Sequence, residues 1–181
     1  TIVNLSSMTV VQRLELSTRS ARAIALHPSG DTVAVGYSDH AIRVFDCKSF
    51  RQLAGWTGHT NSVFTLAYTR DGRFLLSAGR DAHLKAWDVE DGYRQHGDVV
   101  AHLFAINNLD FSPDGKHFVT CSLDKSIKVW RTADLTLLKV IDKARHAGHG
   151  TSVNRVLWTT YKDQVLSASD DRTISSWDVI F

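Results

Sequence analysis

One stretch, residues 58–88 (GHTNSVFTLAYTRDGRFLLSAGRDAHLKAWD), contains a pattern that the rest of the chain repeats. It begins with Gly58-His59 and ends at Trp87-Asp88, with an Asp-Gly turn between them. Apolar and polar residues alternate over short runs on both sides of this turn, which predicts antiparallel strands joined by tight turns. No stretch has the spacing of an amphipathic helix, so the sequence predicts no helix.

The same landmarks return at intervals of about 42 to 47 residues. They occur once before this stretch in a weaker form, and twice after it: Ser17, Ser29-Gly30, Asp39 and Phe45-Asp46; His102, Asp114-Gly115, Asp124 and Trp130-Arg131; His149, Asp171 and Trp177-Asp178. Several fixed offsets that recur together are not a chance event. A period of this length is typical of an array of repeated structural units.

The pattern resembles the WD-repeat β-propeller family, in which Gly-His opens each unit and Trp-Asp closes its third strand. The resemblance covers the whole chain and includes four recognisable repeats. It implies an all-β propeller made of four-stranded antiparallel blades set around a channel. Seven or eight blades are usual in that family, so we expect this chain to be part of a larger ring.

We expect residues 1–181 to form a single WD-repeat array without a second domain. Its predicted parts are 1–16, the end of a preceding blade; 20–54, blade one; 58–100, blade two; 101–142, blade three; and 148–181, blade four without its outer strand. In blade four, residues 159–163 replace the Asp-Gly turn, so a hairpin of different geometry is expected there.

The charge of the chain argues against two classes of partner. There are 21 Lys and Arg and 19 Asp and Glu, and the formal net charge of +2 provides no basic field for nucleic acid or for a membrane surface. The first residues lack the pattern of a signal peptide, and no run of about 18 apolar residues could cross a bilayer. We therefore expect a cytoplasmic protein with neither nucleic-acid nor membrane partners.

The two cysteines, Cys47 and Cys121, lie at different places in the repeat. A disulfide between them is therefore not expected, and they show no metal-ligand spacing. We expect two free thiols in a reducing compartment.

One set of residues resembles a catalytic site, because Ser, His and Asp are the residue types of nucleophilic hydrolysis. This set returns in three repeats, each time with Trp six residues after Asp: His59, Ser77, Asp81 and Trp87; His102, Thr120, Asp124 and Trp130; His149, Ser167, Asp171 and Trp177. A catalytic site is built once and not once per repeat. The resemblance implies instead a buried hydrogen-bond network in each blade, in which Asp accepts from His, His meets the hydroxyl and the hydroxyl meets the indole.

Blade one has Ser17, Val35 and Phe45 at three of the four network positions. It cannot form the network, so we expect this region of blade one to be apolar. With no catalytic set left over, we expect no enzyme and no cofactor.

A second pattern, His146 and His149 in HAGH, could suggest a metal site. No third ligand stands at a suitable spacing, and His149 belongs to the blade-four network, so we expect no metal. Together with Lys139, Lys143 and Arg145, His146 is expected to form a small solvated basic loop.

The resemblance also implies a binding side, the rim where the Gly-His connections and the second hairpins emerge. The matching positions are those five residues after the His and those directly before the hairpin Asp: Arg22, Phe64, Asn107 and Asn154; Ser38, Arg80, Leu123 and Asp170. Arg and aromatic residues are the usual anchors of protein interfaces. We expect a non-catalytic scaffold that binds a protein or peptide there. The alternatives are an enzyme with a site at the channel mouth and, less favoured, an RNA-binding propeller.

The two ends of the array complement one another. Thr9 to Leu16 reads as an outer strand whose own blade is mostly missing, and blade four ends before its outer strand. We expect either further blades in a longer chain or a second copy that completes the ring as a homodimer.

Overall fold

The chain folds almost entirely into antiparallel β-sheets, described for residues 2–13 and 17–180 of the computed structural model. The first sheet comprises β3 (Ala21–Leu26), β4 (Thr32–Tyr37), β5 (Ala41–Asp46) and β6 (Gln52–Thr57). The second comprises β7 (Val63–Tyr68), β8 (Phe74–Gly79), β9 (His83–Asp88) and β10 (Arg94–Val100). The third comprises β11 (Ile106–Phe111), β12 (His117–Ser122), β13 (Ile127–Arg131) and β14 (Leu137–Ile141). The all-β prediction with four-stranded sheets is confirmed.

Two smaller sheets lie at the ends of the chain. The fourth sheet comprises β15 (Val153–Trp158), β16 (Gln164–Ser169) and β17 (Ile174–Asp178), while β1 (Ile2–Asn4) pairs with β2 (Thr9–Gln12). The expected outer strand from Thr9 to Leu16 is thus paired over its first residues, and its last three residues lie outside the described chain. The boundaries of the blades stay predictions.

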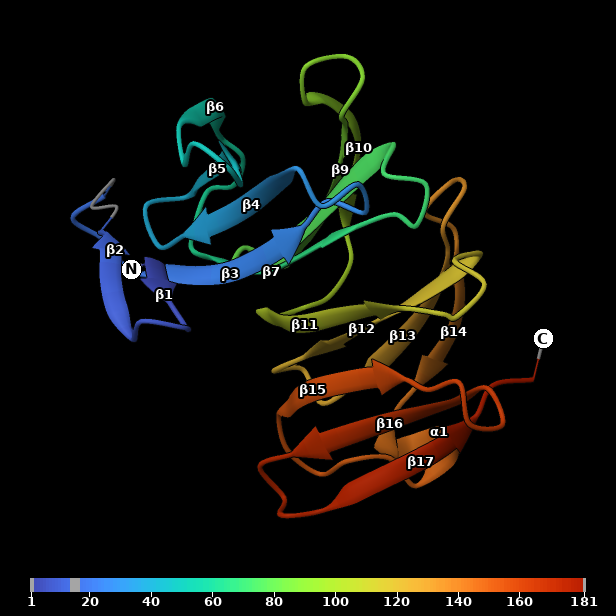
Figure 1. The fold of residues 1–181 in the computed structure, drawn as a ribbon. Helices are drawn as coiled ribbons and strands as arrows, with labels where there is room; N and C mark the ends of the chain where they lie inside the picture. The colour runs from blue at the N-terminus through green and yellow to red at the C-terminus, as the bar shows by residue number, and fades with distance from the viewer. Residues whose placement is uncertain (1, 14–16, 181) are drawn as a thin grey trace.

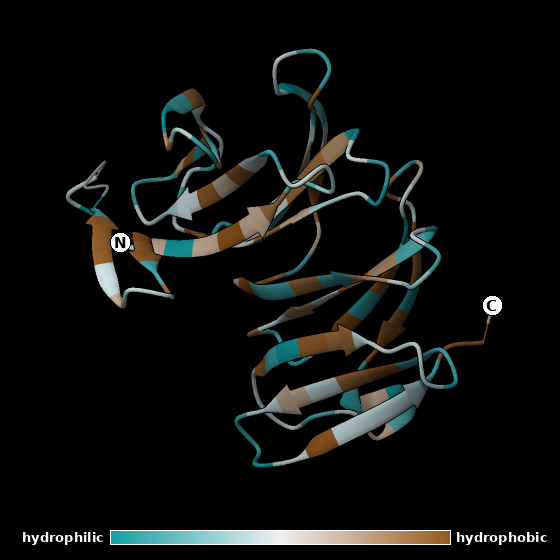
Figure 2. Ribbon diagram, in the orientation of Figure 1, coloured by the Kyte–Doolittle hydropathy of each residue, from teal (hydrophilic) through white to brown (hydrophobic). Residues whose placement is uncertain are grey.

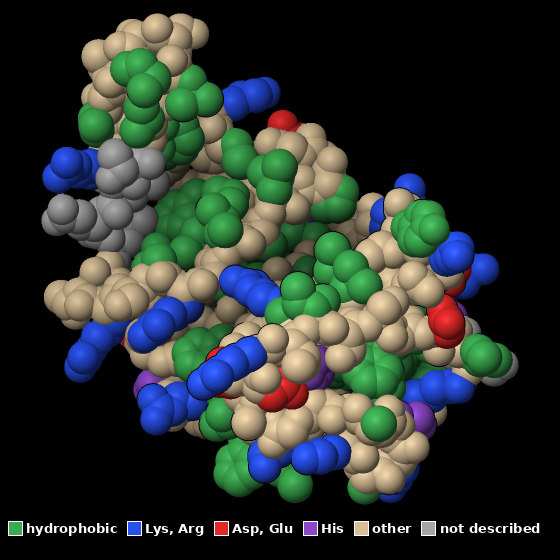
Figure 3. Space-filling model, turned by 90° about the horizontal axis from the view of Figure 1, so that it is seen from below, with side chains coloured by type: hydrophobic (Ala, Val, Ile, Leu, Met, Phe, Trp, Pro, Cys, Tyr) green, Lys and Arg blue, Asp and Glu red, His purple; other side chains and the backbone are tan. Residues whose placement is uncertain are grey.

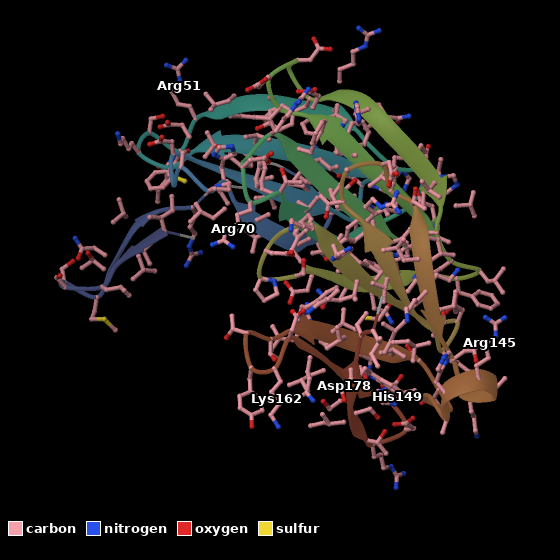
Figure 4. All side chains as sticks on the ribbon, turned by 90° about the vertical axis from the view of Figure 1, so that its right-hand side faces the viewer. Arg51, Arg70, Arg145, His149, Lys162 and Asp178 are labelled. Atoms are coloured by element: carbon pink, nitrogen blue, oxygen red, sulfur yellow. The ribbon has the colours of Figure 1, made fainter. Side chains whose placement is uncertain are left out.

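The four larger sheets follow one another in space as they do in the sequence (Figure 1). The first strand of each sheet contacts the first strand of the next, so β3, β7, β11 and β15 form the inner row. These strands run in the same direction, and therefore all four begin on one side of the molecule, at the left in Figure 1. The turns that join each first strand to the second lie on the opposite side, which faces the viewer in Figure 4.

The hydrophobic core lies between neighbouring sheets. Leu76 and Leu84 of the second sheet pack with Phe118 and Trp130 of the third, and a second cluster joins the third sheet to the fourth. Strands covered on both faces need apolar residues at successive positions, which is why β8 (FLLSAG) does not alternate. Figure 2 shows the same distribution, with hydrophobic residues in the strands and hydrophilic residues in many of the loops.

Side chains of one inner strand also bond the backbone of the next. Asn108 Oδ1 accepts a hydrogen bond from Val156 N at 3.1 Å, and Asp110 accepts from Trp158 N at 2.7 Å. Burial raises the pKa of Asp110. These bonds fix the position of β15 against β11, because each satisfies a backbone N–H that the sheet itself leaves free.

The prediction that the chain contains no helix is wrong at one place. One helical turn, α1 (Lys143–His146), lies in the long connection between the third and fourth sheets. Asp142 caps it by accepting from Arg145 N at 2.9 Å, and Ala147 ends it in the left-handed conformation. A capped turn of this kind depends on local hydrogen bonds, which hydrophobic periodicity does not report. No helix among the described residues is long and apolar enough to cross a membrane.

The hairpin between β15 and β16 differs from its three counterparts. Each counterpart has one glycine with positive φ, such as Gly72 at 76°, whereas here Lys162 and Asp163 have φ of 51° and 53°. Trp158 Nε1 donates to Asp163 Oδ1 at 2.8 Å and holds the turn against the sheet. The expected change of hairpin geometry is observed.

Both cysteines are free, and burial raises the pKa of both thiols. Cys121 is fully buried, with its pKa raised to about 12, whereas Cys47 is partly exposed. Since the thiolate is the reactive form, we expect a disulfide reagent to label Cys47 and to label Cys121 only after unfolding. Mass spectrometry of the native and denatured protein would count the labels, and two labels on the native protein would contradict the buried position of Cys121.

Candidate functional site

Four of the rim residues share one backbone feature. In the second sheet Val63 pairs with Gly79 and Thr65 pairs with Ala78, which leaves Phe64 without a paired residue in the partner strand. The same β-bulge occurs in every inner strand at the corresponding residue: Arg22, Asn107 and Asn154. A bulge re-aims the side chain of its extra residue, so all four positions leave the regular alternation of the strand at the same end.

The other four rim residues lie beside these bulges. The backbone N–H groups of Ser38, Arg80, Leu123 and Asp170 donate to the carbonyl oxygens of Ser20, Ser62, Ala105 and Ser152, at 2.9, 2.9, 3.0 and 3.1 Å respectively. Each acceptor stands two residues before a bulge. The second hairpin of each sheet is thereby bound next to its bulge, and the eight residues lie along one edge of the molecule.

The side chains on this edge differ in their exposure and in the contacts they make within the molecule. Arg22 Nε donates to Ser38 Oγ at 2.9 Å, and the Arg22 guanidinium lies 5.9 Å from the centre of the Phe64 ring. Arg80 is exposed. Arg22, Phe64 and Arg80 therefore present two cations and one half-buried aromatic ring.

Farther along the edge, two rim residues are committed to contacts within the molecule. Asn107 Nδ2 donates to Val153 O at 2.8 Å, and Asn154 Nδ2 donates to Asp170 at 2.5 Å. Leu123 remains 51% exposed. Asn107 serves the contact between the third and fourth sheets and is the least available of the eight.

Sequence reasoning missed two further residues on this edge. Leu103 and Phe104 are 83% and 58% exposed, and Ser122 Oγ donates to Phe104 O at 3.2 Å. They lie beside Leu123, whose backbone is bound to Ala105. Their signal in the sequence is two large apolar residues directly after His102, in a connection where polar residues are usual.

Beneath the rim, the three sets of Asp, His, hydroxyl and Trp residues form continuous hydrogen-bond chains. In the third sheet His102 Nδ1 lies 2.9 Å from Asp124 Oδ2, His102 Nε2 lies 2.7 Å from Thr120 Oγ1, and Trp130 Nε1 lies 2.9 Å from that same Oγ1. The second and fourth sheets have the same bonds, at 2.7 to 3.0 Å: His59, Ser77, Asp81 and Trp87; His149, Ser167, Asp171 and Trp177.

The direction of these bonds follows from donor chemistry. The indole N–H of Trp130 can only donate, so the Thr120 hydroxyl accepts it and gives its own proton to His102 Nε2. His102 then carries its proton on Nδ1 and donates to Asp124. Each of these side chains therefore has a hydrogen-bond partner while the imidazole of His102 is neutral. The N–H and O–H donors of the side chains are used within the network, so the arrangement is suited to holding loops in place.

Two of the networks each contain one further hydroxyl group. Ser126 Oγ lies 2.6 Å from Asp124 Oδ1 and 3.2 Å from His102 Nδ1, and Thr173 Oγ1 occupies the same place beside Asp171 and His149. Both follow the Asp by two residues. This spacing from the Asp is the signal of these hydroxyl groups in the sequence.

The networks shift the pKa of their carboxyl groups. Burial alone would raise the pKa of Asp124, but the hydrogen bond from His102 and the backbone N–H of Leu103 outweigh it, and the net pKa is below its usual range. The pKa of Asp81 is lowered in the same way, and that of Asp171 chiefly by the hydrogen bond from Thr173. Burial lowers the pKa of His102.

We expect the stability of the protein to fall as the pH falls below about 6.5, the usual pKa of histidine. Because the folded pKa of His102 is lowered, the unfolded chain binds the proton first, and this contribution to stability is lost as the pH falls toward the folded pKa. The lowered pKa of Asp124 adds a further loss below its usual pKa of 3.8. Urea midpoints from tryptophan fluorescence at several pH values would test this, and a constant midpoint down to pH about 5 would contradict it.

The first sheet corrects the expectation of an apolar region. Asp39 accepts from Ser17 Oγ at 2.7 Å and from Arg43 Nη2 at 2.9 Å, and the Arg43 guanidinium lies 4.5 Å from the centre of the Tyr37 ring. Burial opposes this ion pair, but the bonds from Arg43 and Ser17 lower the pKa of Asp39 to about 2. Val35 and Phe45 are apolar as expected, while Ser17, at the His position, bonds Asp39, and Arg43 supplies the charged partner of this half-buried carboxylate.

The described residues contain no group of three or more His, Cys, Asp or Glu that could hold a metal ion. His146 lies exposed in α1, whereas His149 is buried in its network. Lys143 and Arg145 share α1 with His146, and Lys139 lies on β14. Figure 3 shows Lys and Arg side chains spread over the visible face among hydrophobic and uncharged groups.

Comparison with known families agrees with the fold. The family model described as "WD domain, G-beta repeat" matches residues 9–46, 50–88, 94–131 and 141–178. The chain belongs to the WD-repeat family. This membership accounts for the recurrent network, since each repeat contributes one copy of it.

Among WD-repeat relatives, the WD repeat-containing protein 91 homolog of Dictyostelium discoideum is 29% identical over 86 residues, which is 48% of this chain and 11% of that protein. The Periodic tryptophan protein 2 homolog of Mus musculus is 29% identical over 90 residues, 49% of this chain and 10% of that protein. Eukaryotic translation initiation factor 3 subunit I of Drosophila willistoni is 26% identical over 171 residues, 89% of this chain and 52% of that protein. The chain thus spans about a tenth of the first two relatives and about half of the third.

Proposed function

We propose that this WD-repeat chain is a non-catalytic scaffold that binds a protein or peptide partner on the rim. The observation that carries the proposal is the recurrence of the β-bulge, which turns Arg22, Phe64, Asn107 and Asn154 toward one edge. The three repeated networks support the non-catalytic part, because their hydrogen-bonding groups are already paired with one another.

The anchor of the proposed interface is the group formed by Arg22, Phe64 and Arg80. Arginine and aromatic residues contribute most to binding when a partner excludes water from them. The Arg22 guanidinium keeps hydrogen-bond donors beyond the one that binds Ser38, and the Phe64 ring is half-buried, so little side-chain freedom would be lost on binding. Leu103, Phe104 and Leu123 add an exposed apolar area on the same edge.

The test is the joint substitution Arg22→Ala, Phe64→Ala and Arg80→Ala, followed by affinity capture and quantitative mass spectrometry. A matched control replaces two arginines and one aromatic residue away from the rim: Arg51→Ala, Arg94→Ala and Tyr161→Ala. We expect the wild type and the control to recover the same partners, and the rim variant to recover more than about tenfold less of them. A loss of about 1.4 kcal/mol or more of binding free energy would produce this fall. Equal recovery by the rim variant would refute the rim as the binding site.

The class of partner has one alternative, an RNA. The printed name of one relative, the U3 small nucleolar RNA-associated protein 21 homolog of Schizosaccharomyces pombe, associates that protein with RNA. The net charge of +2 favours a protein partner. A binding constant that falls steeply with salt would instead support RNA. The cytoplasmic location stays a prediction, and a fluorescent fusion that accumulates in the nucleolus would contradict it.

The ring is proposed to be completed by further blades or by a second copy of the chain. The fourth sheet has three strands among the described residues, and β2 pairs only with the short strand β1. A strand edge without a partner favours association. The mass in solution tests this: a compact monomer that does not aggregate at micromolar concentration would contradict closure by a second copy.

A further inference from the structure

A cleft of about 790 Å³ opens between the second and third sheets on the side opposite the rim. Its walls come from the turn after β7, the turn after β11 and the connection after β13, including Arg70, Lys116 and Thr132. Figure 4 looks onto this side and labels Arg70. A smaller pocket of about 90 Å³ shares Phe74 and Thr132 with the cleft and continues between the sheets to Leu76 and Leu135.

The neighbouring pair of sheets explains why space is left here. Between the first and second sheets the ring of His27 fills the corresponding place, where its Nε2 lies 3.1 Å from Gly72 O and its ring contacts Tyr68 edge-on at 4.9 Å. The residue that matches His27 in the second sheet is Thr69, whose short side chain bonds Asp71 and Phe74 within its own turn. The third sheet therefore meets no such ring.

One wall residue carries an unsatisfied polar group. Thr132 lines both spaces, and its Oγ1 is buried with no hydrogen-bond partner among residues 2–13 and 17–180. Buried hydroxyls in native proteins are nearly always paired, so an exception calls for an explanation. A hydroxyl that gives up no bond can turn toward a bound molecule at little cost.

The mouth of the cleft carries charges of both signs, from Arg70, Lys116 and Arg131 on one side of the balance and from Asp71 and Asp114 on the other. The carboxylates of Asp71 and Asp114 already accept hydrogen bonds from Thr69 and Ser112 in their own turns, at 2.6 and 2.7 Å. Lys116 is 78% exposed at its side chain, and its ammonium reaches Asp114 only at 3.8 Å.

The two arginines at this mouth differ in their pairing. Arg131 is paired with Asp134 at 2.9 Å, and Arg70 bonds the carbonyl of Pro113. The other guanidinium N–H groups of Arg70 make no hydrogen bond among the described residues. Arg70 and Lys116 can therefore meet an incoming carboxylate.

We propose that this cleft is a second binding site, for an extended segment of a protein partner in which a large apolar side chain is followed by carboxylates. The apolar side chain occupies the small pocket against Phe74, Leu76 and Leu135, and the carboxylates meet Lys116 and Arg70. The Thr132 hydroxyl bonds the backbone of the segment. The site is independent of the rim and lies on the other side of the molecule, so a WD-repeat scaffold of this kind holds two partners at once.

The probe is the synthetic peptide Ac-Gly-Leu-Glu-Glu-Gly-NH2, titrated into the ¹⁵N-labelled chain and followed by amide chemical shifts. We expect shifts concentrated at residues 69–74, 114–117 and 131–135, with weak binding in the millimolar range. Replacing Leu of the peptide by Ala is expected to weaken binding about tenfold or more, because the buried apolar area is lost. Replacing both Glu by Gln tests the charge, and unchanged affinity would overturn that part of the proposal.

Three protein variants separate this site from the rim. Thr69→His introduces an imidazole ring like that of His27, which fills the matching place beside the first sheet. The turns at the two positions make the same backbone hydrogen bonds. This variant is expected to abolish the chemical-shift changes caused by the peptide. Lys116→Glu, at an exposed position, is expected to weaken binding about tenfold. The rim variant is expected to bind the peptide as the wild type does. Absence of shifts at millimolar peptide, or undiminished binding by both Thr69→His and Lys116→Glu, would overturn the site while leaving the rim proposal intact.

Discussion

Replacing His102 by Ala is expected to lower the free energy of unfolding by about 3 to 5 kcal/mol, the loss typical of leaving a buried carboxylate without its partner. The imidazole is fully buried and bonds both Thr120 Oγ1 and Asp124, so its removal leaves a hydroxyl and a carboxylate without their partner. It also opens a cavity beneath the connection that carries Leu103 and Phe104. The effect is therefore larger than that of one lost hydrogen bond.

Urea unfolding followed by tryptophan fluorescence measures this loss. The control is His146→Ala, an exposed histidine in α1, whose expected effect lies within about 0.5 kcal/mol. A loss below about 1 kcal/mol for His102→Ala would mean that the network contributes no more than an ordinary hydrogen bond. It would remove the structural role that we assign to the repeated set.

A loss of similar size, about 3 to 5 kcal/mol, is expected for Phe118→Ala. Phe118 is fully buried and stacks on Trp130 at a centroid distance of 6.1 Å, with Leu76 and Leu84 of the second sheet in the same cluster. Because the cluster joins two sheets, the cavity would weaken the contact between them as well as the third sheet. We expect the urea dependence of unfolding to become less cooperative.

Phe104→Ala is the matched control, since this ring is 58% exposed and its loss leaves no cavity. Its expected effect on stability is within about 0.5 kcal/mol. Equal effects of the two substitutions would contradict the position of Phe118 between the sheets. A fluorescence and a circular-dichroism transition that fail to coincide for Phe118→Ala would indicate that the sheets separate before they unfold.

Much of the fold follows from local patterns in the sequence. The four-stranded sheets could be predicted because alternating apolar residues and Asp-Gly turns specify hairpins over a few residues. The same pattern recurs in each repeat, which supports the same structure for every unit. The sets around His59, His102 and His149 could be found because their spacing is the same in each repeat. The turn of α1 was missed because its stability comes from one cap and not from a periodic apolar face.

Other features depend on distances between residues of different strands or sheets, and only the tertiary structure decided them. The bulges that re-aim Arg22 and Phe64 are shifts of register, which leave no mark in composition. Asp39 and Arg43 form an ion pair because a partly buried carboxylate needs a partner. The repeat pattern predicted no role for Arg43. The cleft beside Thr132 exists because Thr69 is short where His27 fills the matching space, and that consequence is visible only when two sheets are placed side by side.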